Sequence, residues 1–208
     1  MNTMQESKVI EAVSVSGEAL QELLTGVITH ADIKSDTPVL NSVRIATLGG
    51  SLIAEATDRY RLVRGAIDVF IVQDESGTLA ESVISAAEAK QVINLCKSLS
   101  KRQAVTITRA GDLISFSSAG NSVTLNALSV NMPNFDQFLE PVNEPAQLSE
   151  LRFNPKFFAD LAKLCGKRAG FNGVKVTFGV AANKPYQFTI EGESVTYRGA
   201  IMPMKGGN

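Results

Sequence analysis

The sequence repeats one order of secondary structure three times, and this repeat limits the possible folds more than any other feature. The first copy opens with a segment of alternating polarity and continues with a helix whose apolar residues recur every three or four positions. Three strand-like segments with turn residues between them follow. These segments are residues 12–16, 20–28, 40–50, 51–58 and 60–72. The order predicted for the first copy is therefore one strand, one helix and three strands.

The second copy repeats that order. Its opening strand is expected at 82–85, where Ser85 and Glu88 have the spacing of a capping box at a helix start. The helix that follows has an apolar face that includes Cys96, and the strands after it are residues 103–109, 113–119 and 122–130. The first 140 residues are therefore predicted to be one domain of two βαβββ modules.

The third copy is predicted to open with a strand at Leu151–Phe153, with Asn154 as the helix N-cap and Pro155 at the first helical position. The helix is expected to bury Phe158, Leu161, Ala162 and Cys165, and its strands are residues 173–180, 186–191 and 194–204. Residues 131–147 contain three prolines and lack periodicity, which favours a linker. Residues 141–208 are thus predicted to be linker and one further module.

Composition argues against an enzyme. One His and two Cys cannot form a His-rich or four-cysteine metal site, and a nucleophilic triad would need His30, which we expect to be a partly exposed residue at a helix end. Glycine-rich phosphate loops are absent, and no partner is evident for Asp58 or Asp136 as an acid/base pair. We therefore predict no catalytic residues, no metal and no cofactor.

The chain has no apolar stretch long enough to span a membrane, and residues 1–8 lack an apolar signal core. Cys96 and Cys165 are interpreted as small core residues in a reducing compartment. The expectation is a soluble, cytoplasmic protein without a membrane partner.

Basic residues gather on two of the three predicted helices although the formal net charge is only −1. Such a face is what non-specific binding to phosphates would use. The alternative is an ordinary solvated face on which the helix dipole favours lysine toward the C-terminal turns. The first helix has no basic residue. The residues concerned are Lys90, Lys97, Lys101, Arg102, Lys156, Lys163, Lys167 and Arg168.

Three short segments occur in order along the repeat: ATDRYRL at 56–62, NMPNFD at 131–136 and AIMPMK at 200–205. Together they resemble the ATD-x-x-RL segment, the linker and the C-terminal tail of one family. That family is the bacterial-type DNA polymerase sliding clamp, the beta subunit of the replicative polymerase. The resemblance implies an α+β clamp fold built from βαβββ repeats, with helices on one face of antiparallel sheets. Residues 12–140 look like the middle clamp domain and 148–205 like the second half of the last one.

The resemblance also implies function. Clamps of this family encircle duplex DNA, contact its backbone and tether a polymerase or repair protein through a pocket for short apolar peptides. That pocket would here comprise Leu40, Thr57, Tyr60, Arg61, Leu62, Pro133, Phe138, Ile201, Met202, Pro203 and Met204. Flexible methionines beside leucine and proline suit varied apolar anchors.

The chain lacks counterparts of the first clamp domain and of one further module. Family rings contain twelve modules, so we expect a homotetramer, because the lone third module needs a neighbour over its sheet edge and helix. A clamp loader is an implied partner, and a short clamp would suit a phage. The alternative hypothesis is a clamp-derived decoy or regulator that binds clamp-interacting peptides, or a full-length clamp, without enclosing DNA.

Overall fold

We describe a computed structural model of the chain, in which residues 11–70, 77–100, 102–140, 152–165, 175–177 and 185–204 are described. The predicted order is present in the first two modules. Module one contains β1 (Glu11–Ser16), α1 (Gly17–Val27), the 3₁₀ helices η1 (Ile28–His30) and η2 (Pro38–Asn41), β2 (Ser42–Leu48), β3 (Ser51–Thr57) and β4 (Arg61–Asp68). Module two contains β5 (Ser82–Ser85), α2 (Ala86–Ser98), β6 (Ala104–Ala110), β7 (Leu113–Ser118) and β8 (Asn121–Asn126). Next come α3 (Asp136–Leu139), α4 (Pro155–Leu164), β9 (Lys175–Thr177), β10 (Tyr186–Glu191) and β11 (Thr196–Ile201).

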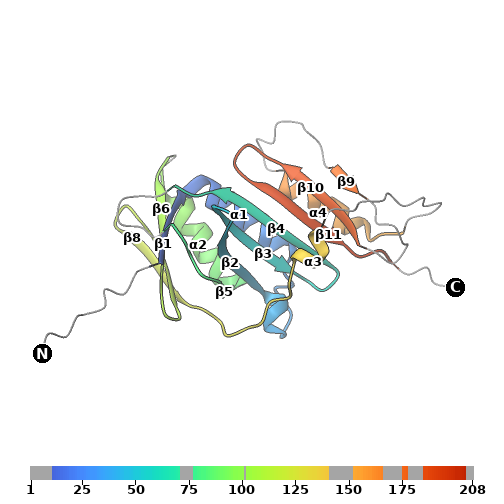
Figure 1. The fold of residues 1–208 in the computed structure, drawn as a ribbon, viewed down its shortest axis with the longest axis horizontal. Coiled ribbons are helices and arrows are strands. Elements are labelled where there is room, and N and C mark those ends of the chain that lie inside the picture. The colour runs from blue at the N-terminus through green and yellow to red at the C-terminus, as the bar shows by residue number, and fades with distance from the viewer. Residues whose placement is uncertain are drawn as a thin grey trace, which may run out of the picture.

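Modules one and two exchange their opening strands. β1 pairs with β6, so that one sheet has the order β1-β6-β7-β8. β5 pairs with β2 in the other sheet, whose order is β5-β2-β3-β4-β11-β10-β9. Every pairing is antiparallel. The exchange makes the two modules one interlocked unit, as Figure 1 shows.

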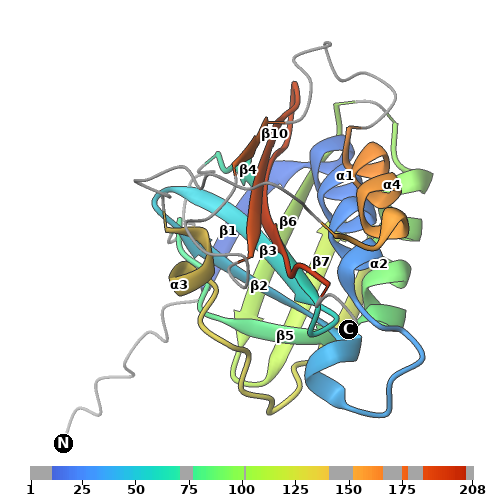
Figure 2. The same cartoon turned by 90° about the vertical axis from the view of Figure 1, so that its right-hand side faces the viewer.

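Helices α1, α2 and α4 lie side by side on one face of the sheets, with α1 packed against both α2 and α4, and the short helix α3 lies on the opposite side (Figure 2). Their sequences explain this arrangement, since each helix has one apolar face. Ser16 caps α1, the capping box predicted at Ser85 and Glu88 is present, and Asn154 caps α4 with Pro155 at its first position. The α+β architecture with helices on one face of antiparallel sheets is therefore confirmed.

The third module extends the sheet of module one through its last strand. β11 pairs with β4 along their length, with Arg198 directly opposite Arg64. Both strands contain the tetrapeptide RGAI, at 64–67 and 198–201, and its arginines are the one pair of like positions that face each other. The Tyr197 ring fills the space beside Gly65, where a Cβ atom would lie 2.9 Å from it.

Several expectations about the third module and its linker are wrong. Arg152 and Phe153 form no strand, and Leu151 lies outside the described residues. Ala162 is exposed, and Phe158 and Cys165 are only half-buried, although all three were expected in the core. Within the predicted linker, Asp136–Leu139 form the short helix α3, and Phe135 is fully buried against Leu62 and Ala200. The missing strand has a physical reason: an opening strand joins the sheet of a companion module, and the third module has none among the described residues.

His30 is also placed differently from the expectation. It is fully buried and tilted against the Phe188 ring, with ring centroids 6.1 Å apart. The Thr29 hydroxyl donates to Gly26 O at 2.7 Å and can therefore accept from His30 Nδ1 at 2.9 Å. His30 Nε2 then has no hydrogen-bond partner among the described residues. Burial, with the charge of Arg61 as a further cause, lowers the pKa of His30 to about 3.

Candidate peptide pocket and basic helix face

An apolar cavity of about 410 Å³ lies where module one, the linker and the third module meet. Eight of the residues predicted for a peptide pocket line it: Leu40, Thr57, Tyr60, Arg61, Leu62, Pro133, Phe138 and Met202. Segments far apart in the sequence therefore form one concave surface. Its lining is mostly apolar, as expected for a site that holds an apolar anchor.

The cavity wall at residues 57–61 is a tight turn built by side-chain hydrogen bonds. Asp58 Oδ1 accepts from the backbone N–H groups of Tyr60 and Arg61, at 3.1 and 3.0 Å. The Thr57 hydroxyl donates to Arg61 O at 2.8 Å. Arg59 occupies the left-handed region with φ of 79°, which the turn requires. These bonds leave the Tyr60 ring exposed at the rim.

Arg61 supports the cavity from behind. Its guanidinium donates to Asp58 Oδ2 at 2.8 Å and to Thr29 O at 2.8 Å, and it pairs with Asp160 Oδ2 of α4 at 2.7 Å. The guanidinium carbon also lies 4.6 Å from the centre of the Phe157 ring. Arg61 thus joins the cavity wall to the third module.

The C-terminal tail runs along the cavity. Met202 N donates to Tyr60 O at 2.8 Å, and the Met202 side chain, 39 % exposed, lines the cavity. Ile201 lies beneath it in the core at 1 % exposure, and Pro203 and Met204 do not line the cavity. Of the four tail residues predicted for the pocket, Ile201, Met202, Pro203 and Met204, Met202 is therefore the one that lines the cavity.

Sequence reasoning missed five residues that line the cavity: Val39, Arg59, Asn131, Pro185 and Ala200. Val39, Arg59 and Ala200 adjoin predicted residues, so widening each segment by one position would have found them. Asn131 opens the linker motif quoted above. Pro185 is the residue directly before β10, and no signal in the sequence predicts that it lines the cavity.

The basic side chains of α2 and α4 are exposed where the structure describes them. Lys90, Lys97, Arg102 and Lys156 are exposed and make no ion pair with a described residue. Lys163 is exposed but pairs with Asp160 at 2.5 Å. Lys101, Lys167 and Arg168 lie outside the described residues. On α1, which lies between the other two helices, Glu18 and Thr25 are exposed instead.

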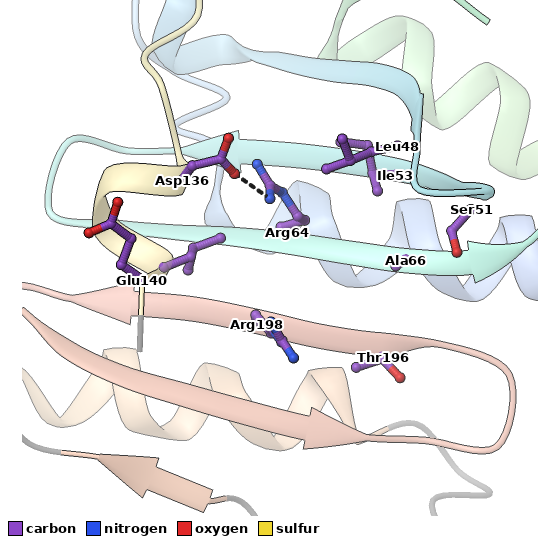
Figure 3. A pocket seen from close by; sticks show the side chains of 10 residues that line it. Leu48, Ser51, Ile53, Arg64, Ala66, Asp136, Glu140, Thr196 and Arg198 are labelled. Carbon is purple, nitrogen blue, oxygen red and sulfur yellow. Dashed lines mark hydrogen bonds and ion pairs between the residues drawn. The ribbon is translucent and has the colours of Figure 1, made fainter. Parts of the chain in front are cut away.

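A second cavity, of about 420 Å³, lies on the seven-stranded sheet beside α3 (Figure 3). Arg64 reaches Asp136 across it at 2.7 Å and also pairs with the fully buried Glu55. Arg198 has Thr189 where Arg64 has Glu55, and it forms no ion pair with another described residue. None of the predicted pocket residues lines this cavity.

The fold can be matched to proteins of known structure. A DNA polymerase III beta subunit from Thermotoga maritima superposes with a TM-score of 0.73 at 16 % identity, over 100 % of this chain and 68 % of that one. The chain has the fold of the bacterial sliding clamp. A sliding clamp from Pseudomonas aeruginosa superposes with a TM-score of 0.74 at 13 % identity, over 94 % of this chain and 67 % of that one. A sliding clamp from Bacillus subtilis superposes with a TM-score of 0.67 at 16 % identity, over 100 % of this chain and 67 % of that one.

The match is one of structure. No protein-family model matches the sequence, and no curated protein matches it significantly. The chain spans about two thirds of the length of the sliding clamps it superposes on. Among the described residues, no cluster of His, Cys, Asp or Glu could hold a metal ion, and no helix is long and apolar enough to cross a membrane.

Proposed function

We propose that this protein acts as a sliding clamp: a ring that encloses duplex DNA without chemistry of its own and tethers replication or repair proteins through the apolar cavity. The observation that carries the proposal is the joint presence of the clamp fold and a cavity assembled from three separate clamp-like segments. Tethering raises the effective concentration of a client near its template, which is sufficient to explain a processivity factor.

The helix face supports DNA binding of a particular kind. Lysine and arginine side chains on α2 and α4 would contact phosphates without reading bases. Glu18 on α1 faces solvent between them, so a tight electrostatic grip is not expected. Weak contact and topological enclosure together would let the protein slide.

Ring closure would need more than one copy. Three modules of this chain are a quarter of a twelve-module ring, which favours a homotetramer of about 89 kDa, four times the 22.2 kDa chain. Light scattering over a concentration series tests this mass. A constant 22 or 44 kDa would contradict enclosure, since too few modules would be present.

DNA retention tests the function directly. Protein is brought to its association concentration with nicked circular DNA present, so that a ring can close around the duplex without a loader. Retention at high salt that is lost when the DNA is linearised supports the clamp. Equal elution from circular and linear DNA would contradict it.

A second candidate is favoured by the cavity itself. Because all of its lining residues come from a single copy of the chain, the protein could capture clamp-binding peptides as a decoy or regulator without enclosing DNA. Peptide binding by a protein that stays monomeric or dimeric and is not retained on circular DNA would support this candidate. Peptide binding together with topological retention would contradict it.

A further inference from the structure

The two cavities lie on the same face of the seven-stranded sheet. β4 contributes Leu62 to the first cavity and Ala66 to the second. β11 contributes Ala200 to the first cavity and Thr196 to the second. Residues four apart on a strand point to the same side, and four residues of strand span about 13 Å. The cavities are therefore close enough for one extended peptide to reach both.

Helix α3 stands between the two cavities. Phe138 lines the first cavity, whereas Leu139 lines the second. The helix is held on the sheet by Phe135, which is fully buried against Leu62 and Ala200. A peptide that enters both cavities must therefore pass over or around α3.

A row of side chains crosses the sheet beside the second cavity, and the module-one half of this row is balanced in charge. Glu55 lies between Arg44 and Arg64 and pairs with both. Arg44 also pairs with Glu81, and Arg64 also pairs with Asp136. Each arginine of this half therefore has two carboxylate partners. Along the sheet the row runs Arg44, Glu55, Arg64, Arg198, Thr189 and Lys175.

The third-module half of the row has cations without carboxylate partners. Thr189 stands beside Arg198 where Glu55 stands beside Arg64. Arg198 and Lys175 form no ion pair with another described residue. Glu191, which lies diagonal to Arg198 on the same face, forms none either. Two positive charges are thus unbalanced within the described part of this half.

Arg198 also faces Arg64 directly across the two strands. Like charges in facing positions oppose strand pairing. Both side chains line the second cavity, and Figure 3 shows Arg64 joined to Asp136 while Arg198 has no such contact. A carboxylate beside Arg198 would supply what Asp136 supplies to Arg64.

The second cavity has a polar part and an apolar part. Thr196 lies two positions before Arg198 on the same face of β11 and lines the cavity with it. Leu48, which is 51 % exposed, and Ile53 line it from β2 and β3. Glu140 extends from α3 away from Arg198 (Figure 3). The lining therefore suits a carboxylate at Arg198 and an apolar side chain next to it.

We propose that the second cavity binds an acidic residue and an adjacent apolar residue of the same client peptide whose apolar anchor fills the first cavity. The carboxylate pairs with Arg198 and accepts a hydrogen bond from the Thr196 hydroxyl, and the apolar side chain packs against Leu48. This site deepens the proposed function, on which it rests for the first anchor. Joining the two contacts in one peptide raises affinity, because the second contact forms at high effective concentration.

The distance between the cavities sets the spacing in the peptide. An extended chain advances about 3.3–3.6 Å per residue, so about four residues span 13 Å, and a path around α3 needs a few more. A spacer of about six residues is therefore long enough. A spacer of one residue holds anchor and acid within about 7 Å and is too short to reach both cavities.

Peptide affinity tests the paired contact. A labelled apolar clamp-binding peptide is extended, at either end in turn, by six Gly/Ser residues and the pair Glu-Leu. At one of the two ends, this extension should bind about threefold to fivefold more tightly than the same extension with Gln-Leu. The one-residue spacer should show no such difference. Equal affinities of the Glu and Gln forms at both ends, with the anchor bound, would overturn the proposal and leave the proposed function intact.

Two variants locate the effect. Arg198→Gln should abolish the difference between the Glu and Gln peptides. Lys175→Gln is the matched control, because it removes the other unpaired cation of the row from a residue that does not line the cavity, and it should preserve the difference. Loss of the difference in both variants would contradict a specific contact with Arg198.

A measurement without the anchor examines the second cavity alone. Acetyl-Glu-Leu-amide at millimolar concentration should shift the methyl NMR signals of Leu48 and Ile53, whereas acetyl-Gln-Leu-amide should not. The shifts should be absent in Arg198→Gln. Unchanged Leu48 and Ile53 signals would refute the site whether or not the anchor peptide binds. Shifted signals in a protein that fails to bind the anchor peptide would support the acid site and count against the proposed function alone.

Discussion

Arg61 and Asp160 lie 99 residues apart in the sequence, yet their side chains form an ion pair of 2.7 Å that is almost completely shielded from water. The pair joins the turn that forms the cavity wall to the helix of the third module. Burial would raise the pKa of Asp160, but the hydrogen bonds from Lys163 and Arg61 outweigh burial and lower it. Asp160 is therefore charged in the folded protein, and the pair couples cavity and module.

Asp160→Asn should separate the third module from module one before the rest unfolds. Loss of the anion from a buried ion pair lowers the free energy of unfolding by about 3 kcal/mol. The loss should be smaller here, because Arg61 still pairs with Asp58. Hydrogen exchange of β10 and β11 should quicken more than that of β6 and β7. Lys163→Gln, which removes only the exposed partner of Asp160, should change stability by less than about 1 kcal/mol. Uniform quickening in all strands would contradict the expected local effect.

His30 should make the protein sensitive to acid. Its folded pKa of about 3 lies below the usual 6.5, so the unfolded chain binds one more proton between these values. Stability is therefore full above pH 6.5 and falls toward pH 3, by about 2–3 kcal/mol at pH 4.5. Urea unfolding at pH 7 and pH 4.5 measures the difference.

His30→Phe is the control for the acid effect. It removes the titrating group and keeps a ring beside Phe188, so the pH dependence between 6.5 and 4.5 should decrease by the same amount. An unchanged pH profile in this variant would mean that another group is responsible. Protonation of Asp160 also lowers stability as the pH falls, because its pKa is lowered in the folded protein. That loss occurs below the unfolded pKa of about 3.9 and therefore outside the range from pH 6.5 to 4.5.

Peptide binding should depend on Met202 more than on Met204. Met202 lines the cavity, whereas Met204 does not, although both are exposed methionines of the same tail. Met202→Ala should weaken binding of a labelled apolar clamp-binding peptide about fivefold to tenfold, as expected for loss of one apolar contact. Met204→Ala is the matched control and should change affinity less than twofold. Fluorescence anisotropy measures both, and the reverse order would remove Met202 from the site.

DNA contact should depend on the helix face and not on the sheet face. Lys97→Glu reverses an exposed charge on α2 and should weaken binding and flatten its salt dependence. Arg198→Glu changes charge by the same amount on the sheet, in the row of Arg64 that lines the second cavity (Figure 3), and should leave DNA binding unchanged. Equal weakening by both variants would show that net charge, not the helix face, matters.

Tyr197 should anchor the third module to α1. Its hydroxyl donates to Glu22 O at 2.8 Å, and its ring lies against Gly26, where a Cβ atom would be 2.4 Å from the hydroxyl oxygen. Tyr197→Phe should cost about 1 kcal/mol through the lost hydrogen bond. Gly26→Ala should cost more, since it displaces the whole ring. Thermal unfolding compares the two, and a neutral Gly26→Ala would contradict this packing.

The repeat, the capping residues and the apolar periods could be found in the sequence because each depends on residues close together in the chain. Ser85 with Glu88, and Asn154 with Pro155, determine where helices begin through local hydrogen bonds and a fixed φ. These local signals determined the order of elements in modules one and two. They failed at Arg152 and Phe153, where a strand depends on a neighbour.

The burial of His30 and the set of residues that line the cavity could not be predicted from the order of elements, because tertiary structure alone decided them. His30 was expected to be a partly exposed residue at a helix end, but it is fully buried, because Arg61 of β4 and Phe188 of β10 lie over this end of the helix. The pairing of β11 with β4 brings Met202 and Pro185 to a cavity whose other wall lies more than a hundred residues earlier. Burial and strand pairing are relations between distant segments. The sequence therefore determined the modules, and the packing of one module on another decided the site.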